Sequence, residues 1–169
     1  MRRFLLGLPL VLACGGATAE QPLHVKLGIP RDQALTELRS QQFCFKPDGP
    51  ARQVETYPRC ERAGTEWGEA WVTATYDAGR LVELKRFERY SDDAHAVERW
   101  NQLIADRMKM APEASDAGVA LRARGPLEAG TRSVKAFRVD DATIVAVYLL
   151  TPSPPEQASV LEAIVSARR

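Results

Sequence analysis

The sequence has no excess of either charge, few aromatic residues and no long apolar run. Its 169 residues carry 23 Lys plus Arg against 22 Asp plus Glu, a formal net charge of +1, and only 7% are Phe, Trp or Tyr. A polybasic nucleic-acid binder has a clear excess of positive charge, and a membrane helix needs roughly 20 apolar residues in a row. The composition therefore excludes a polybasic nucleic-acid-binding protein, a membrane bundle and a disordered tail, and it is typical of one soluble domain.

Histidine is scarce and familiar catalytic motifs are missing. His24 and His95 are the two histidines, and we expect both at the surface, because neither has metal-ligating neighbours at a recognisable spacing. There is no Gly-x-Ser-x-Gly, no Ser-x-x-Lys and no His-Glu-x-x-His. The Asp pairs at 92–93 and 140–141 are explained by a helix start and a turn. We therefore expect no metal and no cofactor, and we favour a protein without catalytic activity; carboxylates that meet only in space are the open exception.

The first 19 residues have the pattern of a secretory signal peptide. Met1-Arg2-Arg3 is a basic start, an apolar run of ten residues spans 4–13, and Ala17-Thr18-Ala19 has the small-x-small form of a signal peptidase site. Cleavage after Ala19 removes two arginines and leaves 150 residues with 21 basic and 22 acidic side chains. The sequence thus predicts a periplasmic or secreted protein, with no overall field to steer a charged partner.

A second processing motif overlaps the first. Val11-Leu12-Ala13-Cys14-Gly15 resembles a bacterial lipoprotein box, in which Cys14 is lipidated and tethers the chain to a membrane. Leu12 stands where such boxes prefer a small residue, and the site ending at Ala19 is the cleaner one. We favour the soluble form, with lipidation at Cys14 as the alternative.

Two cysteines, Cys44 and Cys60, lie beyond the expected signal peptide. In an oxidising compartment such a pair favours a structural disulfide. The alternative is a redox pair, but redox motifs usually place their thiols two residues apart, not fifteen. We therefore predict a Cys44–Cys60 bridge, which removes roughly 3 kcal/mol of unfolded-state entropy in the loop-closure model.

Hydrophobic periodicity predicts one α+β domain over residues 20–169. Apolar residues at helical spacing indicate helices at 31–41 and 91–110, and a capping box at Ser153 indicates a closing helix that carries an apolar stripe to 165. Alternating residues around short turns predict hairpins over 70–87 and 133–150. Shorter extended pieces are expected at 23–27, 43–45 and 53–57. We expect a largely antiparallel sheet of hairpins with two to three helices packed on one face.

The connection over residues 111–130 is longer than loops usually are. We therefore expect it to contain a short strand or helical turn near 119–122. It also provides the wall of a cleft, should the protein have one.

Charged residues of both signs alternate along the second hairpin strand and the helix after it. This pattern predicts a solvated face rather than a nucleic-acid patch. The residues concerned are Arg86, Glu88, Arg89, Glu98, Arg99, Asp106 and Arg107.

Trp67 and Trp71 stand four residues apart around the start of a strand. Trp71 falls on the strand face opposite Val72 and Ala74. Because large aromatics usually supply burial, we expect the Trp71 face to be the core, with the alanines pointing outward. In the alternative, the Trp71 face is the outer one, and Trp67 and Trp71 anchor a partner.

Residues 25–38, Val-Lys-Leu-Gly-Ile-Pro-Arg-Asp-Gln-Ala-Leu-Thr-Glu-Leu, resemble the opening of small bacterial envelope domains of the BamE/SmpA kind and of the β-lactamase-inhibitor-like fold. Those domains begin with an extended stretch, a glycine and a helix of the form Gly-x-(Ser/Thr)-x-x-x-(Val/Ala)-x-x-x-(Leu/Phe), followed by an antiparallel sheet. Here Pro30 replaces the usual Ser or Thr, and the match covers about the first third of the chain beyond the signal peptide. The resemblance implies a non-catalytic envelope protein that acts on another protein through its sheet or loops.

These observations together predict an exported, disulfide-stabilised binding or assembly-accessory module of the bacterial cell envelope. Its expected partner is another envelope protein, with no nucleic acid and no transmembrane segment involved. The alternative is a secreted enzyme, or an inhibitor of one, with a cleft formed by residues 111–130.

Overall fold

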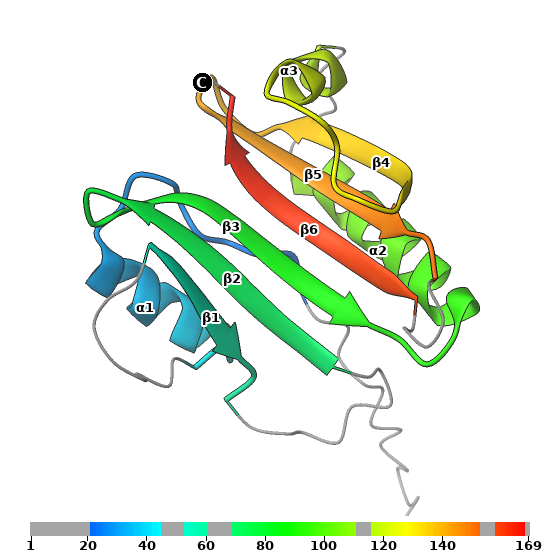
Figure 1. Ribbon diagram of the computed structural model, residues 1–169, viewed down its shortest axis with the longest axis horizontal. Coiled ribbons are helices and arrows are strands. Elements are labelled where there is room, and N and C mark those ends of the chain that lie inside the picture. Colours follow the sequence, from blue (N-terminus) through cyan, green and yellow to red (C-terminus); the bar gives the residue numbers. More distant parts are fainter. Residues whose placement is uncertain (1–20, 45–52, 61–68, 111–115, 153–157, 168–169) are drawn as a thin grey trace, which may run out of the picture.

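Six antiparallel strands form a single sheet in the order β1-β2-β3-β6-β5-β4 (Figure 1). The computed structural model describes residues 21–44, 53–60, 69–110, 116–152 and 158–167. The elements are α1 (Arg31–Ser40), β1 (Val54–Pro58), β2 (Glu69–Asp77), β3 (Arg80–Arg89), α2 (Asp93–Met110), α3 (Ala117–Ala123), β4 (Thr131–Arg138), β5 (Thr143–Leu150) and β6 (Ser159–Ser166). The expected α+β class with an antiparallel sheet is confirmed.

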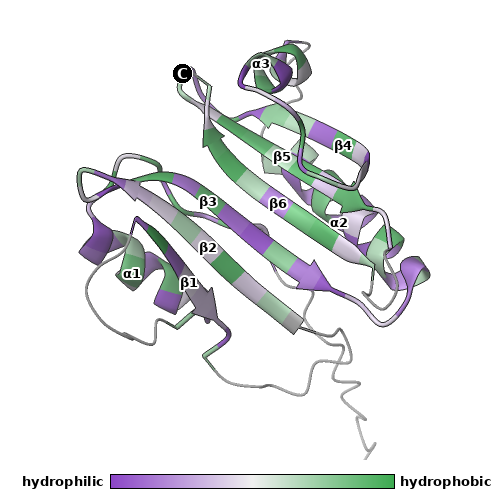
Figure 2. Ribbon diagram, in the orientation of Figure 1, coloured by the Kyte–Doolittle hydropathy of each residue, from purple (hydrophilic) through white to green (hydrophobic). Residues whose placement is uncertain are grey.

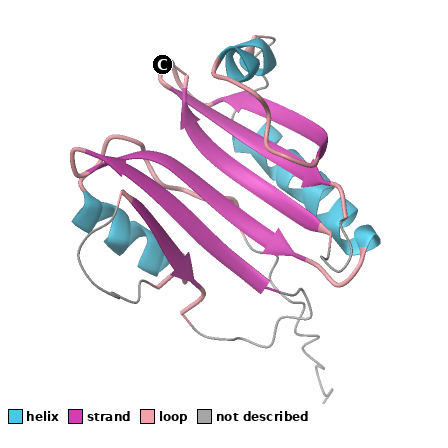
Figure 3. Ribbon diagram, viewed as in Figure 1, coloured by secondary structure: helices cyan, strands magenta, loops and turns pink. Residues whose placement is uncertain are grey.

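Both predicted hairpins are present, and local turn chemistry explains them. The β2–β3 turn places Ala78 at φ 46° and Gly79 at φ 75°, the left-handed pair that a two-residue hairpin turn requires. The β4–β5 hairpin turns at 139–142, where the carboxylate of Asp140 accepts a hydrogen bond from the backbone of Ala142 at 2.7 Å. The helical turn expected near 119–122 is also confirmed as α3 (Figure 3).

The closing helix predicted up to residue 165 is wrong, because this segment is strand β6. It lies between β3 and β5, in the centre of the sheet. Val160, Leu161, Ile164 and Val165 are buried, two on each face of the sheet. Apolar residues at this spacing fit one helical stripe and both faces of a central strand equally well, and the β-branched Val and Ile favour the strand. The capping box at 153–156 lies outside the described residues.

Two of the three helices pack on one face of the sheet, which we call the inner face. The first, α1, covers β1–β3 through Leu38 against Val72 and Leu84, and α2 covers β4–β6 through Leu103 against Phe137 and Val147. The third, α3, packs on the opposite, outer face against β4–β6. The expected packing of two to three helices on one face is thus met by α1 and α2, and α3 is an additional short helix on the other face (Figure 1).

The outer face consequently has two different halves. Over β4–β6 it is covered by α3 and the segment 124–130, whereas no helix among the described residues covers it over β1–β3. We call the latter half the open face. Figure 2 shows that β5 is largely hydrophobic, as a doubly covered strand should be, while the middle of β3 is hydrophilic. No described helix is long and apolar enough to cross a bilayer.

The Cys44–Cys60 disulfide is present and ties the chain after α1 to the end of the edge strand β1. Its Cα atoms are 4.7 Å apart. Two backbone hydrogen bonds flank it: the Cys44 amide donates to the Pro58 carbonyl at 2.8 Å, and the Cys60 amide donates to the Gln42 carbonyl at 2.9 Å. Of the shorter extended pieces, 53–57 becomes β1, 23–27 forms no strand, and Phe43 makes a single bridge with Arg59.

Replacing both Cys44 and Cys60 by alanine should lower the free energy of unfolding by roughly 3 kcal/mol, because the unfolded chain gains the entropy of an open loop. Urea denaturation with and without reductant measures this. Reductant should destabilise the parent protein and leave the double variant unchanged. Equal stability of parent and variant under oxidising conditions would contradict the role assigned to the bridge.

Candidate functional site

Five charged side chains are buried between the inner face of the sheet and α2. Arg86 and Glu88 come from β3, Glu162 from β6, and Arg99 and Arg107 from α2; all are 0–6% exposed. Because residues two apart on a strand and four apart on a helix share a face, the backbone aims all five at one region. We call them the buried ion network.

Glu162 is the central acceptor of the network. Arg107 Nε donates to its Oε1 at 2.7 Å, and Arg86 Nη2 lies 2.7 Å from its Oε2. The backbone amide of Leu23 donates to the same Oε2 at 3.1 Å. One carboxylate thus connects β3, β6, α2 and the segment before α1.

Glu88 is the second carboxylate of the network. Arg99 Nε donates to its Oε2 at 2.7 Å, Arg86 Nε lies 3.0 Å from its Oε1, and the Tyr90 hydroxyl also donates to it. Burial alone would raise the pKa of Glu88, but the charge of Arg86 and the hydrogen bonds from Arg99 outweigh it and lower the pKa to about 2. Glu88 therefore remains ionised at neutral pH, and both carboxylates hold elements together.

The network also holds the segment that precedes α1. Arg86 Nη1 donates to the Gln21 carbonyl at 2.8 Å, and Arg107 Nη2 donates to the Leu23 carbonyl at 2.6 Å. The Leu23 side chain is itself 1% exposed. Three guanidinium groups face two carboxylates, so the backbone carbonyls complete the solvation of the excess positive charge.

The predicted solvated face is wrong for Arg86, Glu88, Arg99 and Arg107. The alternation of charges was interpreted as exposure, yet Arg86 and Glu88 lie on the strand face that the helices cover. A signal on α2 was present in the sequence: Arg99 and Arg107 flank Leu103 at a spacing of four, so all three share the buried side of the helix. Glu98 is exposed as expected.

The expectation that the Trp71 face is the core is also wrong. Val72 and Ala74 are fully buried on the inner face, whereas Trp71 is half-buried on the open face. Small residues are needed on the inner face because α1 packs closely there through Ala34 and Leu38. The alternative, an outward-facing Trp71, is what the structure has; Trp67 lies outside the described residues.

Trp71 contacts both an aromatic ring and a guanidinium group on the open face. Its ring lies against that of Phe87, its cross-strand partner, with centroids 5.2 Å apart and 9° between the planes. The guanidinium carbon of Arg89 lies 5.3 Å from the Trp71 ring centroid. Stacking and cation–π attraction hold this group on the strands. We call Trp71, Phe87 and Arg89 the aromatic stack.

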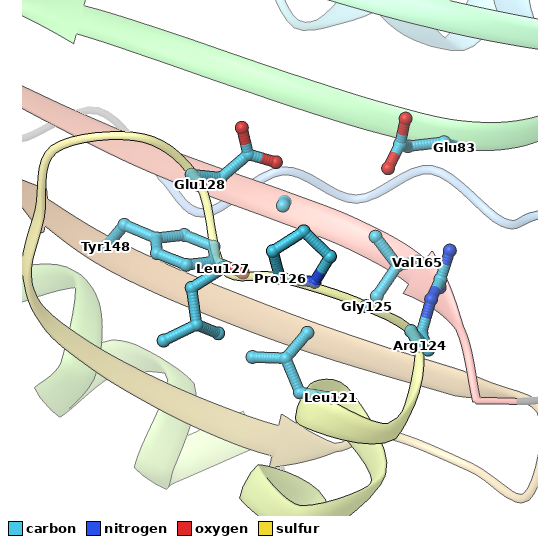
Figure 4. Close-up of a pocket in the computed structure, with 10 residues that line it drawn as sticks. Glu83, Leu121, Arg124, Gly125, Pro126, Leu127, Glu128, Tyr148 and Val165 are labelled. Atoms are coloured by element: carbon cyan, nitrogen blue, oxygen red, sulfur yellow. The ribbon is translucent and has the colours of Figure 1, made fainter.

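A row of apolar side chains leads from the stack to a pocket. In strand register, Phe87 pairs with Leu161, and Leu161 pairs with Tyr148. Beyond them the segment 124–128 leaves a hollow of about 180 Å³ at the edge of the covered half of the outer face (Figure 4). Its lining residues are Glu83, Leu121, Arg124, Gly125, Pro126, Leu127, Glu128, Tyr148, Ala163 and Val165. The cleft expected from 111–130 thus has a counterpart lined by 124–128, while 111–115 lie outside the described residues.

Charged groups at the mouth of this pocket are partly paired. Lys85 Nζ lies 2.7 Å from Glu128 Oε1 and 3.7 Å from Glu83 Oε1. Burial, followed by the charge of Glu128, raises the pKa of Tyr148 to about 12, so its hydroxyl keeps its proton at neutral pH.

The remaining candidate residues are not brought together. His24 and His95 are both exposed, and His95 pairs with Asp92 at the start of α2. In the described part of the chain, no three His, Cys, Asp or Glu side chains converge in a way that would hold a metal ion. Cys14 lies outside the described residues.

No model of a known protein family matches the chain, and neither a curated protein nor a solved structure matches it.

Stability should fall in acid as Glu88 takes up a proton. Its pKa is about 2 in the folded protein against a usual 4.5, so its contribution is complete above pH 4.5 and is lost as the pH falls towards 2. Glu88→Gln should destabilise the fold by roughly 3–5 kcal/mol at pH 7, because Arg86 and Arg99 lose their shared carboxylate. In this variant the free energy of unfolding should also fall less steeply as the pH is lowered. Urea unfolding at a series of pH values measures this.

The exposed Glu98→Gln on the same helix is the matched control, and it should change neither the neutral stability nor the acid slope. A Glu88→Gln variant with the parent's stability at pH 7 would show that the network does not stabilise the fold.

Proposed function

We propose that this protein is an exported, non-catalytic binding or assembly-accessory module of the bacterial cell envelope, and that it holds a protein partner on its open face. The aromatic stack is the observation that carries the proposal. It puts an indole, a phenyl ring and a guanidinium side by side on the half of the outer face that no described helix covers.

The composition of the stack suits a protein interface. Tryptophan and arginine are the residues that most often dominate binding energy, and they do so when a rigid scaffold presents them. Trp71 and Phe87 sit on directly paired strands in the interior of the sheet, so little side-chain entropy remains to be lost on binding. Thr73 and Thr75 extend the same face along β2, and Val54 on β1 is 52% exposed. These residues supply the polar and apolar surroundings of an anchor.

Three observations support export and an envelope location. The signal-peptide pattern ends at Ala19, the Cys44–Cys60 disulfide is of the kind that persists in oxidising compartments, and residues 25–38 resemble the opening of BamE/SmpA-like envelope domains. Membrane tethering through Cys14 is the competing form of the same proposal.

Trp71→Ala should abolish partner binding while the fold survives, because the side chain is half-exposed and its loss leaves no buried cavity. A photo-crosslinking residue at Thr73, placed in the full chain in its native cells, should give a discrete protein adduct, and the same residue at Glu98 on α2 should not. Adding Trp71→Ala should remove the adduct, since losing a central anchor costs roughly 2 kcal/mol or more, about a thirty-fold loss in affinity.

Trp71→Phe is the rescue variant, because it keeps a ring against Phe87. Thermal unfolding of the three proteins separates the outcomes. If Trp71→Ala lowers stability strongly and the adduct persists in the folded fraction, Trp71 is a packing residue and the binding proposal fails.

The intact mass of the protein recovered from those cells decides its processing. We expect the mass of the chain beginning at Glu20, less two hydrogens for the disulfide, because Ala17-Thr18-Ala19 is the better cleavage site. A chain beginning at an acylated Cys14 would instead establish the tethered form. A mass that retains the first residues unchanged would contradict export.

A further inference from the structure

The pocket beside residues 124–128 is reached by the hydroxyl of Tyr148, which has no hydrogen-bond partner among the described residues. Tyr148 is only 3% exposed, and within the described residues its hydroxyl makes no hydrogen bond. The ring is buried, but the hydroxyl itself is accessible from the pocket. Figure 4 shows its ring lying along the pocket with the hydroxyl end towards Pro126 and Leu127. The pocket therefore offers a hydrogen bond to water or to a ligand.

The inner part of the pocket is apolar. Leu121 from α3, Pro126 and Leu127 from the following segment, and Ala163 and Val165 from β6 form its walls. These side chains meet there because α3 packs on the outer face and ends before the sheet's centre. A ligand that fills this space needs an apolar body to replace the water it displaces.

The mouth of the pocket offers an acceptor for a cation. The Lys85 ammonium is within hydrogen-bond distance of Glu128. It lies 3.7 Å from the Glu83 carboxylate, so it forms an ion pair with Glu83 but no hydrogen bond. The nearby guanidinium of Arg124 donates to the Ser166 carbonyl at the end of β6. Figure 4 shows Glu83 and Glu128 both on the side of the pocket opposite Leu121 and Leu127, with Glu128 nearer Tyr148 and Glu83 nearer Val165. Glu83 is the polar group best placed to bind an ammonium.

We propose that this pocket binds a small organic amine, with its ammonium on Glu83, its apolar body against Leu121 and Val165, and a polar group at its far end on the Tyr148 hydroxyl. This site is separate from the proposed partner surface and does not depend on it. Glu83 lies on β3 at the edge of the open face, the other contacts come from the covered half, and none of the aromatic stack lines the pocket.

Tyramine is a suitable probe because it joins a primary ammonium, an apolar ring and a terminal hydroxyl. Titration of the full chain, followed by amide chemical shifts, should give saturable shifts around Ala163 and residues 124–128. Phenethylamine, which lacks the hydroxyl, should bind roughly ten-fold more weakly, the worth of one hydrogen bond. 4-Hydroxyphenylacetate, in which a carboxylate replaces the ammonium, should not bind.

Two variants assign the contacts. Tyr148→Phe should weaken tyramine about ten-fold and leave phenethylamine unchanged, and Glu83→Gln should weaken both amines; Glu98→Gln is the control and should change neither. Tyr148→Phe should also fold at least as stably as the parent, because it deletes a hydroxyl that has no partner.

Three results would each overturn the proposal: no saturable shift with tyramine, equal binding of the carboxylate analogue, or a Tyr148→Phe variant that is clearly less stable than the parent in the absence of ligand. None of them bears on the crosslinking result at Thr73, so failure of this site and failure of the proposed function are distinguishable.

Discussion

The carboxylate of Glu162 is the interaction on which the rest of the structure depends. It lies at the join between β3 and β6, where the two halves of the sheet meet, and it accepts from Arg86, Arg107 and the Leu23 amide at once. None of these charges is tolerable alone in the interior, since an unpaired buried ion costs several kcal/mol. The charged groups of β3, β6 and α2 are therefore stable in the interior only when all three elements are packed together. The network specifies how α2 and the segment before α1 sit on the sheet, in a way that apolar contacts alone do not.

The two faces of the sheet have different tasks. The inner face contains the buried ion network and the contacts with α1 and α2, and its residues stabilise the fold. Among the described residues, helix and loop cover the outer face only over β4–β6, and this leaves both the aromatic stack and the pocket accessible. The strands supply both faces with alternate residues, so Arg86 and Glu88 point inward while Phe87 and Arg89, their neighbours in the chain, point outward. One strand, β3, thus serves the core and the candidate binding surface together.

Features with local causes could be predicted from the sequence. The hairpins depend on turn residues beside alternating strands, and α1 and α2 on apolar residues at helical spacing. Features that depend on distant partners could not. Arg107 and Glu162 are 55 residues apart, so nothing near either one marks it as buried. Whether Trp71 or Ala74 faces the core depends on which side α1 covers, which strand alternation leaves undecided. The apolar pattern of β6 fits a helix as well as a strand, and only its position between β3 and β5 decides for the strand.

The central position of β6 has a consequence for the order in which the chain folds. Residues 159–166 pair with β3 on one side and β5 on the other, so the two halves of the sheet have no direct hydrogen bonds until this late segment reaches its place. Contacts between residues so far apart in sequence form slowly, because a long loop must close first. A chain with this topology cannot complete its sheet until residues 159–166 have been synthesised. Pairing of β6 then joins the two halves in one step.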